Sequence, residues 1–330
     1  MTTTPGGTRM RLTPTRLLAL LLAALALAIA GCGDDDGGGG SGGTVASGVD
    51  LSGASFTVGS KEFTEQLILG QITMQVLRAA GAEARDQTGL EGSLAARRAL
   101  TSGEIDMYWE YTGTAWVTYL DNEEGIPDAQ QQAEELAEAD RENGVAWLPI
   151  AEANNTYAFA VRSDTGTEVD QVETLSDLAE LAKSNPELAT LCVGEEFSTR
   201  PDGLPGVEET YGFEFPGNQV SLVGDAVVYD QVARGDRCNF GSVFATDGRI
   251  AANELRVLED DKAFFPFFNP ALTVRANVLE EHPQLEELFA PVIDALTDEV
   301  LIELNAKVDV EGQTPEDVAS EFLEEQGIVG

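Results

Sequence analysis

Strands that pass directly into helices constrain the fold of this chain more than any other feature of its sequence. Between residues 56 and 119, short β-rich runs alternate with runs whose apolar side chains recur at the helical period. The predicted order is strand 56–58, helix 67–77, strand 82–86, helix 94–100 and strand 105–108. Repeated units of this kind favour a parallel sheet whose helical crossovers are right-handed.

The same alternation returns further along the chain. Its predicted strands are 158–162, 191–194, 219–223, 239–244 and 255–258, and its predicted helices are 175–183, 203–211 and 226–234. A strand at 271–275 and helices near 283–296, 298–308 and 315–326 complete the chain. We therefore predict an α/β protein of two lobes, with 51–155 and 262–330 in the first lobe and 156–261 in the second. The chain crosses between the lobes twice.

Two of the strand-to-helix turns carry polar and aromatic residues. Gly59 breaks the first strand and opens the segment GSKEFTE, and the third strand runs into the segment EYTGT, which begins at Glu110. In open α/β sheets such turns lie at the carboxyl ends of the strands, where helix N-termini present unpaired N–H groups. Both turns are therefore expected to face one cleft.

These two segments resemble paired signatures of the substrate-binding lipoproteins of osmoprotectant ABC importers, which take up glycine betaine, proline betaine, choline or carnitine. The similarity continues through NTYAF at 155–159, EFSTRPDG at 196–203, TDGRI at 246–250 and FPFFN at 265–269. Together the motifs extend the resemblance over about residues 51 to 330. It implies the type II periplasmic-binding-protein-like fold, in which two hinge crossings join two α/β lobes and the ligand cleft lies between them.

A quaternary ammonium group has no N–H to donate, so the faces of aromatic rings hold it well. Each ring contributes about 0.5–2 kcal/mol once water is excluded. Carried over motif by motif, the resemblance implies a cage of Tyr111, Tyr157, Phe244 and Phe268. The family has tyrosine where this chain has Phe244 and Phe268. Phenylalanine keeps the π face and loses the hydroxyl, so the cage should survive while its selectivity among betaines is expected to change.

Other interpretations of these rings stay open. Phe244 ends an apolar strand and Phe268 lies in the aromatic cluster 264–268, so core packing is an alternative role for both. Trp109, Trp116 and Tyr229 are alternative rings for the cage.

A betaine also carries a carboxylate. Lys61 and Arg200 match the family's cationic anchors for this group, and Thr114 matches its hydroxyl donor. Charged donors at a helix N-terminus bind a carboxylate through charge-assisted hydrogen bonds. Because Lys61 comes from the first lobe and Arg200 from the second, a shared ligand would draw the cleft closed. The alternatives are a surface lysine and an arginine paired with Glu196 or Asp202.

Residues 1–31 have the pattern of a signal peptide. Three arginines precede an apolar run at 17–30 that is short for a membrane span. The run ends in IAGC, similar to a bacterial lipobox, which implies cleavage before Cys32 and lipid attachment to its thiol. An ordinary secretory signal is the alternative. Residues 32–50 are rich in Gly, Asp and Ser and would tether the folded domain to the membrane.

The two remaining cysteines, Cys192 and Cys238, each lie beside a predicted strand of the second lobe. Export makes a disulfide permissible. Sequence does not show whether their Cα atoms come within bridging distance, so two buried thiols are the alternative.

Composition excludes several classes of function. The 58 acidic residues against 19 basic ones give a net charge of −39, which argues against nucleic acid as a partner and suits a soluble exported protein. His282 is the single histidine, so the chain lacks the residues for a histidine-based catalytic triad or zinc site. Neither a P-loop motif nor a nucleophile-elbow motif is present in the sequence. We predict no catalytic residue, metal or cofactor; a hydrolase built on paired carboxylates is the enzymatic alternative.

These observations together predict a monomeric receptor that is lipid-anchored to the outer face of the bacterial cell membrane. It would bind a quaternary-ammonium osmoprotectant, with glycine betaine or proline betaine favoured, and deliver it to an ABC permease driven by ATPase subunits. The alternatives are the same fold selecting choline, carnitine or another small solute, and a sensor or surface lipoprotein without a transport role.

Overall fold

The structure is a computed structural model that describes residues 48–122, 125–163 and 165–330. The predicted signal peptide, Cys32 and most of the predicted tether lie outside the described residues. Among the helices of the described ranges, none has the length and apolar character needed to cross a membrane.

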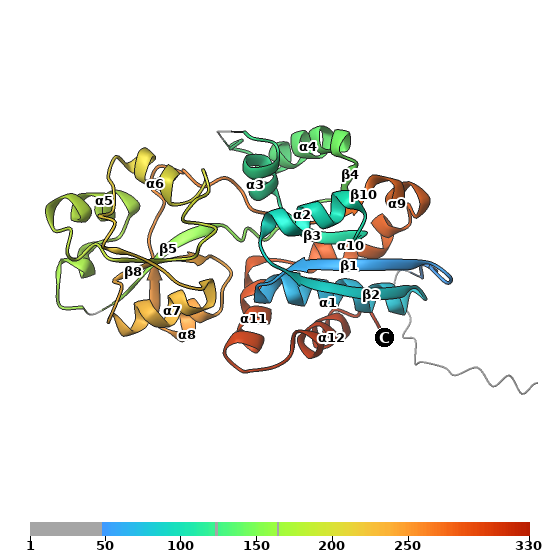
Figure 1. Cartoon of the computed structure of the whole chain (residues 1–330). Coiled ribbons are helices and arrows are strands. Elements are labelled where there is room, and N and C mark those ends of the chain that lie inside the picture. Colours follow the sequence, from blue (N-terminus) through green and yellow to red (C-terminus); the bar gives the residue numbers. More distant parts are fainter. Residues whose placement is uncertain (1–47, 123–124, 164) are drawn as a thin grey trace, which may run out of the picture. The chain divides into compact units, whose positions relative to one another are not determined.

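The first lobe is built on a five-stranded sheet with the order β2, β1, β3, β10, β4 (Figure 1). These strands are β1 (Ser55–Lys61), β2 (Glu83–Leu90), β3 (Met107–Tyr111), β4 (Val145–Trp147) and β10 (Pro270–Arg275). β1 runs parallel to β2 and β3, whereas β10 is antiparallel to both β3 and β4. The chain therefore returns to this sheet after the second lobe is complete.

Helices cover both faces of the first sheet. They are α1 (Thr64–Ala79), α2 (Ser93–Ser102), α3 (Thr112–Thr114), the π-helical turn η1 (Ala115–Tyr119), α4 (Ala129–Asp140), the 3-10 turn η2 (Arg141–Asn143), α9 (Ala276–Glu281), α10 (Leu285–Ala295), α11 (Asp298–Asp309) and α12 (Pro315–Glu325). α1, α10, α11 and α12 share one apolar core with the sheet, and α2 packs in a separate cluster with Ile105 and Tyr108. Of the apolar positions of α1 that the helical period predicted, Ile68, Ile72, Val76 and Leu77 are buried, whereas Leu67 is only partly buried.

The second lobe is built on a sheet with the order β7, β6, β8, β5, β9. Its strands are β5 (Tyr157–Arg162), β6 (Leu191–Val193), β7 (Val220–Leu222), β8 (Phe240–Phe244) and β9 (Leu255–Val257). Its helices are the 3-10 turn η3 (Glu168–Gln171), α5 (Leu175–Ser184), α6 (Leu204–Tyr211), α7 (Asp225–Arg234) and α8 (Arg249–Ala252). α5 and α6 cover one face and α7 the other (Figure 1).

The two sheets share one topology. In each, three parallel strands are followed by a strand that is antiparallel to its neighbours and arrives from the other lobe: β10 in the first sheet and β5 in the second. The segments 148–156 and 258–269 carry the chain between the sheets. The expected two-lobed α/β fold with two crossings is confirmed.

Two of the predicted strand ends that were wrong concern the cleft. β1 does not break at Gly59 but continues to Lys61, so Lys61 ends a strand and α1 begins three residues later. Gly59 allows Ile105 to pack closely against the strand, because a Cβ atom there would lie 2.4 Å from Cδ1 of Ile105 and would force that side chain to shift. β3 likewise continues through Glu110 and Tyr111, which pair with β10. Pairing with a strand that arrives from far along the chain extends β3 beyond its local signal.

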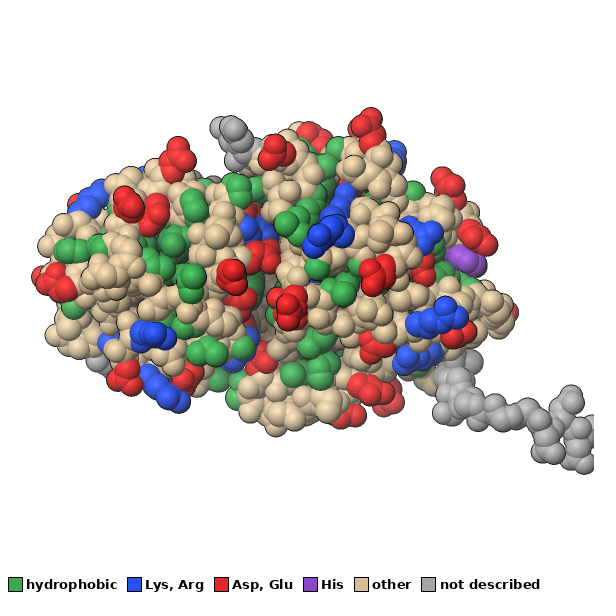
Figure 2. All heavy atoms as spheres, in the orientation of Figure 1, with side chains coloured by type: hydrophobic (Ala, Val, Ile, Leu, Met, Phe, Trp, Pro, Cys, Tyr) green, Lys and Arg blue, Asp and Glu red, His purple; other side chains and the backbone are tan. Residues whose placement is uncertain are grey.

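Acidic side chains are spread over the face of the molecule seen in Figure 2 and are not gathered in one patch. This distribution suits the solvating role inferred from the net charge of −39.

Candidate functional site

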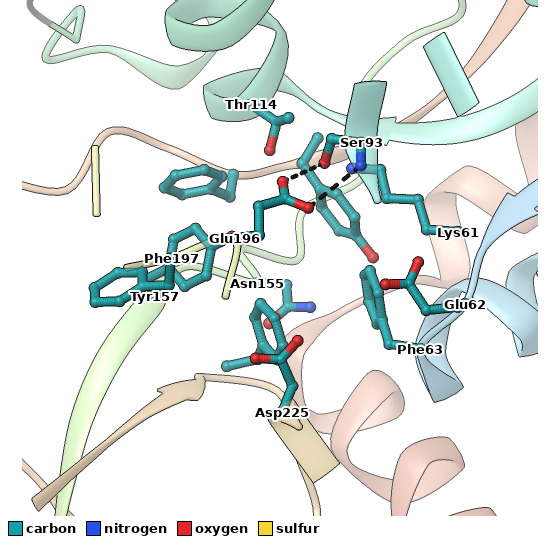
Figure 3. A pocket seen from close by; sticks show the side chains of 13 residues that line it. Lys61, Glu62, Phe63, Ser93, Thr114, Asn155, Tyr157, Glu196, Phe197 and Asp225 are labelled. Carbon is teal, nitrogen blue, oxygen red and sulfur yellow. Dashed lines mark hydrogen bonds between the residues drawn. The ribbon is translucent and has the colours of Figure 1, made fainter. Parts of the chain in front are cut away.

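One cleft is lined by residues of both lobes and contains about 520 Å³ of empty space, part of it open to solvent (Figure 3). Aromatic, acidic and hydroxyl-bearing side chains share its wall with a single lysine. The lining residues are Lys61, Glu62, Phe63, Ser93, Tyr111, Thr114, Asn155, Tyr157, Glu196, Phe197, Asp225, Phe244 and Phe268. Six of the seven predicted ligand-binding residues are among them.

The second lobe and the crossing segment bring three of the predicted rings together. Tyr157 and Phe244 are direct neighbours in the register of β5 and β8, and their ring centroids lie 5.2 Å apart. Phe268, from the second crossing segment, meets Tyr157 edge-on at 5.4 Å. Phe268 reaches this place because Gly113 has no side chain: a Cβ atom there would come within 2.7 Å of the Phe268 ring.

The fourth predicted ring, Tyr111, joins this group through a residue that the prediction missed. Phe63 lies immediately before α1, and its ring stacks on the rings of Tyr111 and Phe244. The ring centroids lie 6.1 Å apart for Phe63 and Tyr111 and 5.3 Å apart for Phe63 and Phe244. Phe197 also lines the cleft, and the centroid of its ring lies 4.7 Å from that of Tyr157. A signal for both residues existed, because each lies within a segment that resembles a family signature.

The alternative rings have other positions. Among the described residues, Trp109, Trp116 and Tyr229 are absent from the cleft wall. Trp109 is buried in the core of the first lobe and donates its indole N–H to Thr73. The hydroxyl of Tyr229 accepts a hydrogen bond from the backbone N–H of Phe244, so Tyr229 supports the strand that carries a lining ring.

Lys61 reaches the cleft but already has an acidic partner. Its ammonium lies 2.5 Å from Oε1 of Glu110 and 5.2 Å from the centroid of the Tyr111 ring. The other oxygen of Glu110 accepts hydrogen bonds from the hydroxyls of Tyr108 and Tyr119. Glu110 is completely buried, so this pair fixes the lysine at the cleft wall.

Arg200 is the one predicted ligand-binding residue outside the cleft wall. Its guanidinium pairs with Asp202 at 2.5 Å and with Glu196 at 2.9 Å, the arrangement that the sequence left open as the alternative. It also lies 5.5 Å from the centroid of the Tyr157 ring and 3.5 Å from the hydroxyl of Thr114. The structure therefore places Arg200 behind the lining residues, where it supports Glu196 and Tyr157.

Glu196 extends from the second lobe to the N-terminus of α2 in the first lobe (Figure 3). The hydroxyl of Ser93 donates to Oε1 of Glu196 at 2.7 Å, and the Ser93 backbone N–H donates to Oε2 at 3.3 Å. Burial of the carboxylate opposes its ionisation, but the charge of Lys61 and the bonds from Ser93 and Arg200 outweigh burial and lower the pKa of Glu196. Glu196 is therefore a carboxylate that is held in its charged form inside the cleft.

A second carboxylate, Glu65 on α1, lies behind the rings and was not predicted. It is buried and accepts four hydrogen bonds: from Tyr111 at 2.7 Å, from Asn155 at 2.9 Å, from Thr246 at 2.6 Å and from Asn305 at 2.9 Å. Burial raises the pKa of Glu65 even though these bonds favour the charged form. Tyr111 belongs to the first lobe and Thr246 to the second, so Glu65 connects the two lobes through its hydrogen bonds to their hydroxyls.

Asp225, the first residue of α7, adds further negative charge to the cleft wall. Burial, together with the charges of Glu196 and Glu62, raises its pKa to about 6. Among the described residues, no basic side chain forms an ion pair with its carboxylate, although the charge of Arg249 opposes the upward shift of the pKa. Asp225 therefore changes its charge at about pH 6.

The structure joins Cys192 and Cys238 by a disulfide, with their Cα atoms 5.6 Å apart. The bond lies in the core between the second sheet and α7 and does not touch the cleft. Within the described residues, no cluster of three or more histidine, cysteine, aspartate or glutamate side chains is arranged to hold a metal ion.

Comparison with known proteins gives consistent matches. The family model for the substrate binding domain of ABC-type glycine betaine transport systems, OpuAC, matches residues 54–325. The glycine-betaine-binding protein of Pseudomonas aeruginosa is 37% identical over 277 residues, which cover 82% of this chain and 88% of that protein. The glycine betaine-binding protein YehZ of Escherichia coli is 37% identical over 278 residues, 82% of this chain and 90% of that protein.

Solved structures agree with the sequence matches. The apo structure of Escherichia coli YehZ aligns with a TM-score of 0.60 at 34% identity, covering 83% of this chain and 99% of that one. A structure described as a glycine betaine/carnitine/choline ABC transporter aligns with a TM-score of 0.67 at 26% identity, with the same coverage of 83% and 99%.

Proposed function

Because the chain belongs to the family of substrate-binding domains of ABC-type glycine betaine transport systems, we propose that it is an extracytoplasmic receptor for a quaternary-ammonium osmoprotectant. It captures the solute between its two lobes and delivers it to an ABC permease. Glycine betaine and proline betaine are the favoured ligands. The family consists of solute-binding receptors, and the protein returns its ligand chemically unchanged.

The observation that carries this proposal is the set of aromatic rings that converges on one cleft. Tyr111 and Phe63 come from the first lobe, Tyr157 and Phe244 from the second, and Phe268 from a crossing segment. A quaternary ammonium among such rings gains about 0.5–2 kcal/mol from each face that it contacts after water has left. Rings contributed by both lobes make this gain depend on closure of the cleft.

The polar end of the cleft supports a ligand with a second functional group. Lys61 and the hydroxyls of Ser93 and Thr114 line the wall beyond the rings, and α2 directs its N-terminus there. Such donors suit the carboxylate of a betaine.

The remaining parts of the proposal concern the protein's place in the cell. The apolar run at 17–30 and Cys32 support export and lipid attachment, so that the receptor stands on the outer face of the membrane as a monomer beside its permease. Globomycin, which blocks lipoprotein processing, should then cause an unprocessed form to accumulate, and the Cys32→Ser variant should lose incorporation of labelled palmitate.

Calorimetry of the purified protein with glycine betaine, proline betaine, choline, carnitine and proline tests the central claim. We expect saturable binding of at least one quaternary-ammonium compound and none of proline. A protein that binds none of the five, while its melting curve shows that it is folded, would refute the proposed function.

A further inference from the structure

The corner of the cleft that is best equipped to bind an anion is already filled by a side chain of the protein. The hydroxyl and backbone N–H of Ser93 both donate to the carboxylate of Glu196, as Figure 3 shows. Nη1 of Arg200 donates to the same carboxylate at 2.9 Å. These are the donors that a ligand carboxylate at this end of the cleft would need.

The charges around this corner leave no surplus for another anion. Lys61 is paired with Glu110, and Arg200 is paired with both Asp202 and Glu196. Among the described residues of this corner, two cations therefore face three carboxylates. Glu62 and Asp225, which also line the cleft, add to the negative side. A ligand carboxylate can bind here favourably only when one of the acids withdraws.

Glu196 is the acid that is free to withdraw. Glu110 is completely buried and Asp202 is 4% exposed, whereas the side chain of Glu196 is 37% exposed and belongs to the cleft wall. Its bonds to Ser93 cross from one lobe to the other, so they break when the lobes separate.

We propose that Glu196 acts as an internal substitute for a ligand carboxylate and so determines how the cleft discriminates between zwitterionic betaines and purely cationic choline. This proposal rests on the proposed function. A betaine must displace Glu196 to use the donors of Ser93 and Arg200. Choline has no carboxylate and therefore leaves Glu196 in place. The negative charge of Glu196 then serves as the counter-ion of the choline cation.

Replacing Glu196 with glutamine tests this role, because the amide keeps the shape and removes the charge. The Kd for glycine betaine should fall by about tenfold and the Kd for choline should rise by about tenfold, so that their ratio changes by about 100-fold. The matched control is Glu195→Gln, which removes the same charge from the adjacent, exposed residue outside this cleft. Both Kd values of the control should stay within about threefold of wild type.

The possible results separate the two claims. If wild type and both variants are folded but bind neither ligand, the proposed function fails and this inference fails with it. If wild type binds but Glu196→Gln leaves the ratio unchanged, or weakens both ligands equally, the inference alone is overturned. Should the glutamine variant not fold, Glu196→Asp provides the second test. It keeps the charge but draws it back by one methylene, and it should tighten glycine betaine binding while leaving choline within about threefold.

Discussion

Thr246 and Glu65 connect the two lobes through a buried hydrogen bond, and replacing Thr246 with valine tests what that bond does. The hydroxyl of Thr246 donates to Oε2 of Glu65 at 2.6 Å, and Thr246 is 1% exposed. Valine has nearly the same shape, so the substitution removes the donor without opening a cavity. Oε2 of Glu65 is then left with the side-chain amide of Asn305.

The size of the effect follows from the chemistry of the acceptor. Burial raises the pKa of Glu65, but its four hydrogen bonds all favour the ionised carboxylate. A hydrogen bond to a charged group contributes about 1.5–3 kcal/mol, so its loss corresponds to roughly a 10- to 100-fold change in an equilibrium constant. Because the bond joins the two lobes, its loss destabilises the form in which the cleft is closed. A less populated closed form raises the apparent Kd in proportion. We therefore expect the Kd of Thr246→Val for glycine betaine to rise by roughly 10- to 100-fold.

Two controls separate closure from folding. Thr246→Ser keeps the hydroxyl and should bind within about threefold of wild type. Thr273→Val removes a hydroxyl that donates at 2.7 Å to the backbone of Tyr108 inside the first sheet. That variant should lower the free energy of unfolding by about 1 kcal/mol and leave the Kd unchanged. Calorimetry gives the Kd, and urea denaturation gives the free energy of unfolding.

The reasoning is refuted if Thr246→Val binds as tightly as Thr246→Ser. It is equally refuted if the valine variant unfolds at lower urea concentration while its Kd stays at the wild-type value, because the bond would then stabilise the fold and not the closed cleft.

Substitutions at three further places test other parts of the structure. Tyr157→Ala should raise the Kd for glycine betaine about tenfold, whereas Tyr157→Phe should stay within about threefold because it keeps the ring; an alanine variant that binds like wild type in calorimetry would exclude Tyr157 from the cage. Asp225 has its pKa raised to about 6 by burial and by the charge of Glu196. The folded protein therefore holds this proton more tightly than the unfolded chain, so the stability that protonated Asp225 contributes is lost as the pH rises from about 4 through about 6. In urea denaturation Asp225→Asn should gain about 2 kcal/mol at pH 8 and much less at pH 4.5; equal gains at both values would contradict this assignment. Replacing Cys192 and Cys238 with alanine opens a loop of sequence separation 46 and should cost about 4 kcal/mol in urea denaturation without changing the Kd; an unchanged unfolding midpoint would argue against the bond.

The fold could be predicted largely because its signals are local. The apolar period of α1 and the short β-rich runs identified most elements to within a few residues. The errors at Gly59 and at Glu110 have a common cause. Both residues continue a strand because a distant segment pairs with it: β2 beside Gly59, and β10 beside Glu110. Such pairing leaves no mark in the local sequence.

The candidate site was predictable in its residue types but not in its partners. Tyr157 and Phe244 were expected in the cleft, and the register of β5 and β8 makes them neighbours. Sequence could not reveal that Glu65 would collect donors from positions as distant as Thr246 and Asn305, because only the folded arrangement of both lobes brings them within hydrogen-bond distance.

The cleft also shows why a motif identifies a ligand site more readily than the state of that site. Phe63 lies between Tyr111 and Phe244, and Glu196 takes the donors of Ser93. The rings of Tyr111 and Phe244 thus already contact another ring of the protein, and the donors of Ser93 already bind a carboxylate of the protein. These contacts satisfy the rings and donors without a ligand, so binding exchanges internal contacts for external ones. The affinity for a solute should therefore depend on how firmly Phe63 and Glu196 are held as well as on the cage itself.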